Sequence, residues 1–376
     1  MAIYKPTLNF LNTVKVDTKY SKSYMTDVRD GLFLSTIKDI EPTVVTEVTD
    51  LLALGVAISD KLYKKVSDAF MQGGIDTIIV YGVDMVTSST MTPELVMEAY
   101  EDHEMAIDYS ILILDVADIT KAKLWATTFK SLLDKKHLFI QLDTVTNTIA
   151  EINKFKQDYA VDNITVCVVD NDKYIDNLDA IMWARIRNRD LGSFIVHSTE
   201  LRGVRKPNWT KTEQTNMKDM GLNFISNPIR GKFHIQNGLA NSEVPTELHL
   251  YRLWELRTLK ERLTRLQIEK DKIPTNQSGF EILEATIKGV IFTAKDMGIA
   301  KAIDGGPFAT ETRTDDDGNA FNYLLGKVEL QFPSEEDIRN SDFKFRYFHT
   351  LLDGVRHVDV AGYITQTGEL VLGGNK

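Results

Sequence analysis

The sequence predicts an α/β protein whose core is a doubly wound, mixed or parallel sheet, followed by an α+β region. Three observations carry this prediction. Between residues 75 and 197, short β-branched runs alternate with amphipathic stretches. The runs are continuously apolar, which is typical of parallel strands that are buried on both faces. After residue 200 the pattern changes to short strands, two long helices and further strands.

Five apolar runs in the first region have the length and composition of strands. They span residues 75–82, 108–115, 137–143, 164–170 and 193–197. The stretches between them carry apolar residues at helical spacing, so each run is expected to be one strand of a βαβ unit. An earlier strand, GLFLSTI, and a helix that stops at the Gly-Gly pair of DKLYKKVSDAFMQGG are expected in the same sheet.

The second region opens with short strands punctuated by Gly, Asn and Pro, over residues 221–245. A long helix is predicted over residues 246–270, where the spacing of leucines indicates one apolar stripe. A second helix is predicted to begin at Ser278, with Glu281 completing a capping box, and to end at Gly298.

The residues near the end of the sequence again favour β-strands. Residues 308–332 predict two strands around an Asp-Gly turn, and residues 334–354 predict a helical or irregular stretch. The last segment, 358–376, is rich in β-branched, aromatic and apolar residues. A terminal strand stays ordered only if its backbone groups are paired, so this segment needs a partner strand in its own chain or in another.

Composition excludes several classes of protein. A net charge of -10 and a pI near 5.3 argue against a nucleic-acid-binding protein. The single cysteine, Cys167, lies in the apolar run ITVCVVD, which indicates a buried thiol and leaves no disulfide framework and no Cys-based zinc site. No apolar run approaches the roughly 20 residues that span a bilayer, so we expect a soluble chain without membrane insertion.

Motifs for catalysis and cofactor binding are missing from the sequence. Neither glycine-rich nucleotide motif is present, nor are G-x-S-x-G or H-E-x-x-H, so no cofactor is expected. The segment RTDDDGN resembles a calcium loop, but when Gly318 takes the sixth position, Arg313 and Leu324 occupy positions that require carboxylates. A hairpin turn is the better interpretation of this segment.

Four aspartates follow predicted strands and would lie at the carboxyl edge of the sheet: Asp84, Asp115, Asp143 and Asp170. Converging carboxylates there could hold Mg²⁺ in a phosphotransferase or hydrolase. Aspartate after a strand also caps helices and starts turns. We favour this second interpretation because the Ser, Thr and Lys companions of a metal-assisted site are absent at matching positions, and the enzyme stays as the alternative.

The second region resembles a known family in the order of its segments. GLNFISNPIRGKFHIQNGLANS precedes a helix with LYRLWELRTLKERL, then KIPTNQSGFEILEATIKGVIFTAKDMGIA, and finally DVAGYITQTGELVL. This order is similar to the C-terminal half of contractile tail sheath proteins, which form the outer sleeve of myophage tails and related contractile injection systems. The resemblance covers roughly residues 218–372.

The resemblance implies four parts for this chain. They are an N-terminal arm over residues 1–25, an α/β domain over 26–217, an α+β C-terminal sheath-type domain over 218–357, and a C-terminal arm over 358–376. The extended arms of sheath proteins add strands to sheets of neighbouring subunits, a form of β-augmentation. From composition alone, pairing of the tail within its own chain would be favoured.

Carried onto this sequence, the resemblance implies contacts in both arms and an acceptor hairpin. The arm residues expected to exchange strands are Ile3, Leu8, Phe10, Val14, Val16, Tyr363, Thr365, Leu370, Val371 and Leu372. The acceptor hairpin would include Val328, Leu330 and Phe332. Residues that could face an inner tube are Lys288, Lys295, Glu335, Glu336 and Arg339.

The resemblance also implies a structural function rather than an enzymatic one. Sheath subunits form stacked hexameric rings around a tail tube protein and contract to drive the tube through the host envelope. The expected partners are further copies of this chain, the tail tube, the baseplate and the tail terminator proteins. The expected location is the tail of a bacteriophage virion, assembled in the host cytoplasm.

Overall fold

The structure is a computed structural model. It describes residues 29–87, 90–103, 106, 110–115, 118–133, 135–170, 177–197, 199–229, 232–270, 277–303, 305–314, 319–331, 344–349, 362–364 and 370–372. The predicted N-terminal arm, residues 1–25, lies outside these ranges.

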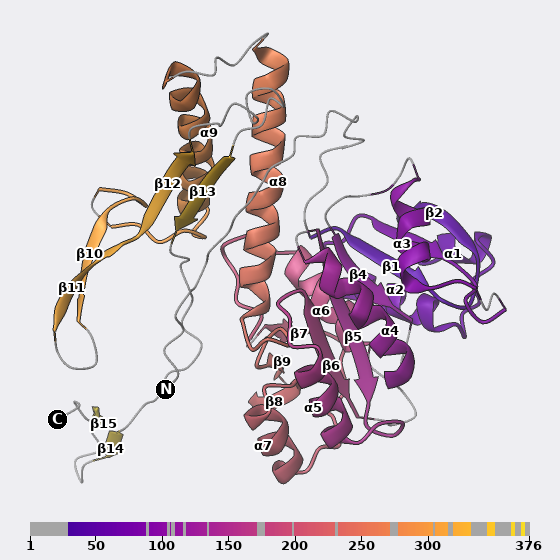
Figure 1. The fold of residues 1–376 in the computed structure, drawn as a ribbon. Helices are drawn as coiled ribbons and strands as arrows, with labels where there is room; N and C mark the ends of the chain where they lie inside the picture. The colour runs from indigo at the N-terminus through magenta and orange to yellow at the C-terminus, as the bar shows by residue number, and fades with distance from the viewer. Residues whose placement is uncertain are drawn as a thin grey trace.

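A nine-stranded sheet forms the body of the molecule (Figure 1). The strand order is β2-β3-β1-β4-β5-β6-β8-β9-β7, and the six strands from β3 to β8 run parallel. The outer strands β2, β9 and β7 are antiparallel to their neighbours. The strands are β1 (Gly31–Ser35), β2 (Ile40–Val45), β3 (Ile78–Gly82), β4 (Ser110–Leu114), β5 (Lys136–Asp143), β6 (Ile164–Val169), β7 (Glu200–Leu201), β8 (Asn223–Ile229) and β9 (Lys232–Gln236).

Helices cover the sheet and bury two apolar clusters. Alternate side chains of one strand go to the two clusters: Phe33 belongs to one, and Leu32 and Leu34 belong to the other. Trp183 packs in the first cluster and Trp125 in the second. The helices in this part are α1 (Asp50–Ala53), α2 (Lys61–Met71), α3 (Pro93–Glu101), α4 (Ile119–Phe129), α5 (Ile149–Asp158), α6 (Leu178–Arg187) and α7 (Lys211–Asp219), with a 3-10 turn, η1 (Lys130–Leu132).

Local sequence signals fix where several helices begin and end. Thr148 begins α5 with a capping box, because its hydroxyl accepts from the backbone N–H of Glu151 while the Glu151 carboxylate accepts from the Thr148 N–H. Thr210 caps α7 in the same way. After α2 the chain passes through Gly73 and Gly74 at φ of 77° and 74°, a left-handed conformation that glycine adopts without strain. The predicted stop of this helix is confirmed.

Four of the five predicted central strands are present as β3, β4, β5 and β6, and Cys167 is buried in β6 as expected. The fifth prediction, a strand at 193–197, is wrong. Phe194 and Val196 are buried in the core, but the Phe194 carbonyl accepts from the Tyr251 hydroxyl at 3.2 Å instead of a neighbouring strand. The place beside β6 is taken by β8, from beyond residue 217. The apolar run at 193–197 indicated correctly that these residues are buried, but they do not pair as a strand.

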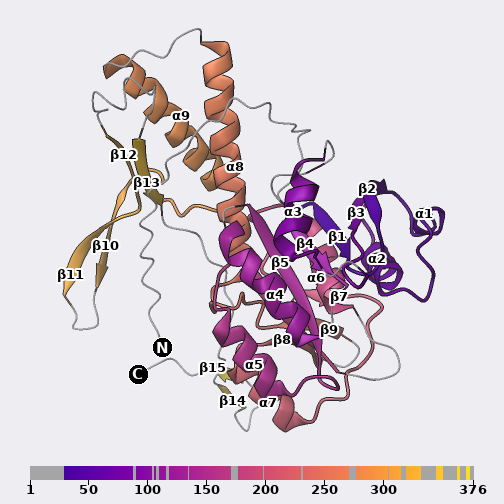
Figure 2. The ribbon, with the colours of Figure 1, turned by 45° about the vertical axis from the view of Figure 1, so that its right-hand side comes forward.

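The C-terminal region is built on two long helices that stand side by side and extend away from the sheet (Figures 1 and 2). They are α8 (Thr246–Glu269) and α9 (Gln277–Asp296). Around them lie β10 (Thr310–Thr314), β11 (Ala320–Leu324), β12 (Gly326–Gln331) and β13 (Lys344–His349), and further along the chain β14 (Gly362–Ile364) and β15 (Leu370–Leu372). The helical or irregular prediction for 334–354 is wrong where β13 forms; other residues of that range lie outside the described ranges.

The first half of α8 is part of the core under the sheet. Leu250 and Leu253 are fully buried there, and further along the helix Leu259 and Leu263 pack in the same cluster as Ile287 of α9. This apolar cluster therefore runs without a break from the sheet into the α8–α9 pair. The two regions share one hydrophobic core.

A buried polar network also joins α8 to the sheet. His249 Nε2 lies 2.8 Å from the Leu133 carbonyl oxygen, which can only accept, so this nitrogen is the donor. His249 Nδ1 then accepts from His137 Nδ1 at 2.9 Å, and His137 Nε2 accepts from the Thr165 hydroxyl at 2.9 Å. The Thr165 oxygen in turn accepts from Thr246 at 3.2 Å. These donor and acceptor roles are those of two neutral imidazoles, in which each ring has one donor and one acceptor nitrogen.

This network predicts a specific pH dependence of stability. Burial, and secondarily the neighbouring His249, hold the pKa of His137 well below 6.5. Below about pH 6.5 the unfolded chain binds a proton at His137 that the folded chain does not, so the free energy of unfolding falls by up to roughly 1.4 kcal/mol per pH unit. A His137→Gln variant should be less stable at neutral pH but should show a shallower decline below pH 6.5 in urea unfolding experiments.

The control for this experiment is His103→Gln, because the His103 side chain is 29% exposed. This variant should keep the wild-type slope. Equal slopes for the wild type and the His137→Gln variant would contradict the network as described.

Candidate assembly site

The strand-end aspartates occupy ordinary turn positions. Asp84 accepts from the backbone N–H groups of Val86 and Thr87, and these turn bonds, led by that of Thr87, lower the pKa of its carboxyl. Asp143 accepts in the same way from Val145 and Thr146. Each carboxylate is thus used within its own turn.

The other two aspartates connect different parts of the chain. Asp115 accepts from Ser35 Oγ at 3.1 Å and from the N–H and hydroxyl of Thr36 at 3.0 and 2.7 Å, which ties the end of β4 to the end of β1. Asp170 accepts from the Asn208 N–H at 2.6 Å. Within the described ranges, no three His, Cys, Asp or Glu side chains are grouped to hold a metal ion. The turn interpretation therefore accounts for Asp84 and Asp143, whereas Asp115 and Asp170 join segments that are distant in the sequence.

One perturbed lysine lies in the same part of the fold. Burial, and then Lys65, lower the pKa of Lys61 to about 8, while Asp179, Asp115 and Asp143 act in the opposite direction. Lys65 itself forms a fully buried ion pair with Asp179, which joins α2 to α6. A buried pair of this kind stabilises the arrangement of the two helices once both partners are present.

The feature that distinguishes the C-terminal region is the two-stranded sheet formed by β12 and β13. β12 and β13 form a two-stranded antiparallel sheet in continuous register from Gly326↔His349 to Gln331↔Lys344. Within the part of the chain that the structure describes, neither strand has a second partner. Among the described strands, the outer edges of β12 and β13 therefore have no neighbour, which is the geometry that accepts an added strand.

The edges of the nine-stranded sheet differ from those of β12–β13. The edge strand β2 contains Pro42, which has no N–H to offer, and a register shift between Ile40 and Thr43. The opposite edge, β7, is only two residues long. The irregular β2 edge and the short β7 strand both discourage pairing with another chain. β12 and β13 contain neither a proline nor a shift in register.

The β12–β13 sheet is fixed to the helices beneath it. Val328 is half-buried against the shared core, and Leu325 just before β12 is fully buried. At the far end of β13, His349 Nε2 contacts the buried carboxylate of Glu255 of α8. Across the helix pair, Arg262 of α8 donates to the Thr293 hydroxyl of α9 at 2.8 Å. The β12–β13 sheet is thus packed against the two long helices.

No protein-family model matches the sequence, and no curated protein does. Solved structures do. A chain of the six-fold symmetrised anti-feeding prophage (AFP) baseplate matches with a TM-score of 0.63 at 12% identity, over 89% of this chain and 93% of that one. A chain of the contracted PVC sheath complex, an extracellular contractile injection system, matches with a TM-score of 0.59 at 15% identity, over 98% of both chains. The sheath tail protein of Listeria innocua gives a TM-score of 0.53 at 10% identity, over 87% of this chain and 96% of that one.

The chain has the fold of contractile sheath proteins. The match to the PVC chain extends over 98% of each chain, so the likeness takes in the α/β sheet as well as the C-terminal region on which the sequence resemblance was based. The resemblance to the sheath family is confirmed at this level. In none of the described helices is there a stretch that is long and apolar enough to cross a membrane.

Some of the residues expected to exchange strands lie within the described part of this sheath fold. Tyr363 belongs to β14, and Leu370, Val371 and Leu372 make up β15. These strands pair antiparallel with one another, so the segment is a short hairpin and not one continuous strand. Neither pairs with any other described strand. The remaining expected contacts, Ile3, Leu8, Phe10, Val14, Val16 and Thr365, lie outside the described residues.

The other expected positions divide in the same way. Val328 and Leu330 belong to β12, whereas Phe332 lies outside the described residues. Lys288 and Lys295 lie on α9 with side chains 41% and 42% exposed. Lys288 pairs with Glu284 at 2.6 Å and lies over the Phe308 ring. Glu335, Glu336 and Arg339 lie outside the described residues.

Sequence reasoning missed β13 and the two histidine contacts that join α8 to its surroundings. The signal for β13 was present in KFRYFH, an alternation of charged and aromatic residues typical of a half-buried strand. The pairing of His137 with His249 and of His349 with Glu255 had no local signal, because the partners are far apart in sequence.

The hydrogen bonds that Asp115 accepts from Ser35 and Thr36 give a test that separates the structural from the enzymatic interpretation. Asp115→Ala should lower the free energy of unfolding by about 2–4 kcal/mol, because three donors at the ends of β1 and β4 lose their acceptor. Asp115→Asn keeps one acceptor oxygen and should cost less. Thermal unfolding measured with and without millimolar Mg²⁺ should give the same midpoint for the wild type. Stabilisation by Mg²⁺ that disappears in Asp115→Asn would instead support the metal-dependent enzyme.

Proposed function

We propose that this chain is the structural subunit of a contractile sheath, which self-assembles into stacked hexameric rings around an inner tube. The observation that carries this proposal is the likeness over 98% of both chains to a protein from the PVC sheath complex in its contracted state. The six-fold symmetry of the AFP baseplate that contains another similar chain supports hexameric rings.

Neighbouring subunits are joined by exchanged strands. The β12–β13 sheet offers two edges, and the chain has two arms, over residues 1–25 and 358–376, that can supply strands to neighbouring copies. Each added strand satisfies backbone groups that would otherwise be exposed, and each main-chain hydrogen bond contributes about 1 kcal/mol net. A link of this kind joins unlike surfaces, so it propagates into rings and helices instead of closing a dimer.

Contraction follows from this architecture without nucleotide hydrolysis. The sheet and the α8–α9 pair share one apolar core, so each subunit moves as a rigid body. The exchanged strands act as tethers while the rigid cores slide and rotate from an extended packing into a tighter one. The energy comes from the difference in buried area and charge pairing between the two packings.

The sheath has three further partners in this proposal. An inner tail tube protein lies inside the rings and contacts the surface of α9 that carries Lys288 and Lys295, which are seven residues apart and share one helix face. Baseplate and tail terminator proteins bind the two ends of the sheath. The particle is assembled in the host cytoplasm and the subunit ends in the virion tail.

Removal of residues 358–376 tests strand exchange. The truncated chain should fold with an unchanged circular dichroism spectrum and should fail to form rings or tubes, because one free edge loses the strand that fills it. Negative-stain microscopy and sedimentation velocity of the full and truncated chains measure this directly. A matched control, Lys295→Ala in the full chain, should assemble normally.

Two outcomes would contradict the proposal. Assembly of the truncated chain into the same rings as the full chain would exclude an essential role for the C-terminal arm. A full-length chain that stays monomeric at high concentration would contradict the sheath function itself.

Charge reversal on α9 tests the contact with the tube. A Lys288→Glu, Lys295→Glu double variant should keep self-assembly but should lose co-sedimentation with preformed tubes, because both substituted side chains lie on one exposed helix face. Glu284→Gln is the control, since it removes the partner of Lys288 within the helix while leaving both lysines. Unchanged tube binding by the double variant would assign the tube contact to another surface.

A further inference from the structure

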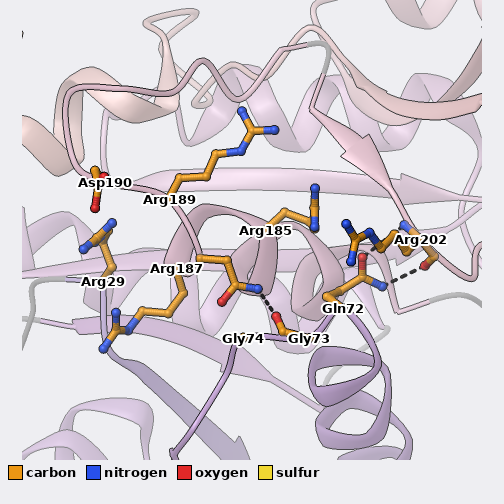
Figure 3. Close-up of a pocket in the computed structure, with 10 residues that line it drawn as sticks. Arg29, Gln72, Gly73, Gly74, Arg185, Arg187, Arg189, Asp190 and Arg202 are labelled. Carbon is orange, nitrogen blue, oxygen red and sulfur yellow. Dashed lines mark hydrogen bonds between the residues drawn. The ribbon is translucent and has the colours of Figure 1, made fainter.

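A pocket of about 460 Å³ lies at the ends of α2 and α6, and arginines dominate its lining (Figure 3). Arg29 comes from the start of the sheet, Arg185 and Arg187 from the last turn of α6, and Arg189 and Arg202 from the segments that follow. In a chain of net charge -10, five arginines around one pocket are a local reversal of sign. A lining of this kind favours an anionic occupant.

Three of these guanidinium groups have no partner in the described part of the chain. Arg185, Arg189 and Arg202 make no side-chain hydrogen bond and no ion pair there, and Arg185 Nε is fully buried without an acceptor. Figure 3 draws Arg185 between the other two. Burial, followed by the charges of Arg202 and Arg189, lowers the pKa of Arg185. The guanidinium groups therefore repel one another, and a bound carboxylate or phosphate would relieve this repulsion.

The acidic groups around the pocket do not balance the arginines. Asp190 is part of the lining, Asp30 accepts from Arg187 at 3.2 Å, and the charge of Glu200 acts on Arg185. These three carboxylates leave an excess of two positive charges from the five arginines. The last turn of a helix accommodates cations well, which explains Arg185 and Arg187 but not Arg202.

The chain itself contains a segment of complementary charge. Asp315, Asp316 and Asp317 follow β10 in the sequence and lie outside the described residues. They link β10 to β11, which pair only with each other among the described strands, and Phe321 of this hairpin is 42% exposed. An isolated two-stranded hairpin is marginally stable in water, so a hairpin that extends from the body gains stability from a partner.

A hairpin and a pocket of the same copy are separated by the long helix. In both Figure 1 and Figure 2, β10 and β11 lie on one side of α8, whereas α2 and α6, which carry the pocket, lie on the other. An acidic segment that reaches the arginines from this hairpin therefore belongs to a second molecule.

We propose that the arginine pocket binds the Asp315–Asp317 segment of a neighbouring copy of this chain. A guanidinium group can donate two parallel hydrogen bonds to one carboxylate. Consecutive aspartates supply several carboxylates from a short stretch of chain. The contact is distinct from strand exchange, because it uses side chains of the α/β region and the tip of a different hairpin. It rests on the proposed function only in requiring that copies of the chain associate.

Direct binding is measured with a labelled peptide of residues 310–324 and the full-length protein. Fluorescence anisotropy should show binding that weakens with salt, since the contact is electrostatic. A control peptide with asparagine at positions 315–317 should bind at least about tenfold more weakly, as should the wild-type peptide to an Arg189→Ala, Arg202→Ala protein. Equal affinity of the two peptides would overturn the proposal. Inorganic phosphate is the second probe: thermal stabilisation by phosphate without any peptide binding would assign the pocket to a small anion and would also overturn it.

Charge exchange in the full chain tests the contact within the assembly. Arg189→Glu, Arg202→Glu in one variant and Asp315→Lys, Asp316→Lys, Asp317→Lys in another should each reduce assembly in sedimentation velocity, with unchanged thermal unfolding. The variant that carries all five changes should recover assembly, because the glutamates of the pocket can then pair with the lysines of the neighbouring copy's segment. Single-set variants that assemble like the wild type would overturn the pocket contact alone, whereas a wild type that never assembles would contradict the sheath function.

Discussion

The constraint on which this architecture depends is the pairing of backbone groups at strand edges. A sheet edge that ends in solvent either is protected or is completed by another strand. In this chain the edges of the two sheets differ. The large sheet protects its edges with Pro42 and a two-residue strand, while β12 and β13 are regular strands that have no second partner among the described strands. The regular strands are the ones that we propose for association.

The proposed role of the β12–β13 sheet depends on how it is attached to the body of the molecule. Leu250, Leu259 and Ile287 belong to one apolar cluster that runs from under the large sheet through α8 into α9. The buried pair of His349 and Glu255 fixes β13 to the same helix. In the proposed contraction, this shared core would move as one body, and the change between subunits would fall on the connections that join them.

Sequence patterns predicted the elements that follow local rules. The buried parallel strands β3 to β6 and the stop of α2 at Gly73 and Gly74 follow from periodicity and from side-chain chemistry within a few residues. The run at 193–197 shows the limit of this reasoning, because an apolar segment can be buried without pairing, and only the position of β8 decides between the two. The tail hairpin formed by β14 and β15 was missed for a related reason: composition indicates strands but not the point at which the chain reverses.

The proposed assembly surfaces were less predictable than the fold, because in the proposal their chemistry is completed between molecules. Arg185, Arg189 and Arg202 are scattered in sequence and no motif connects them; only the folded chain brings them to one pocket without internal partners. Side chains that serve the folding of a monomer are normally paired within it, as Lys65 is with Asp179. Guanidinium groups that lack such partners in the described ranges are therefore the groups that we propose to bind a second molecule.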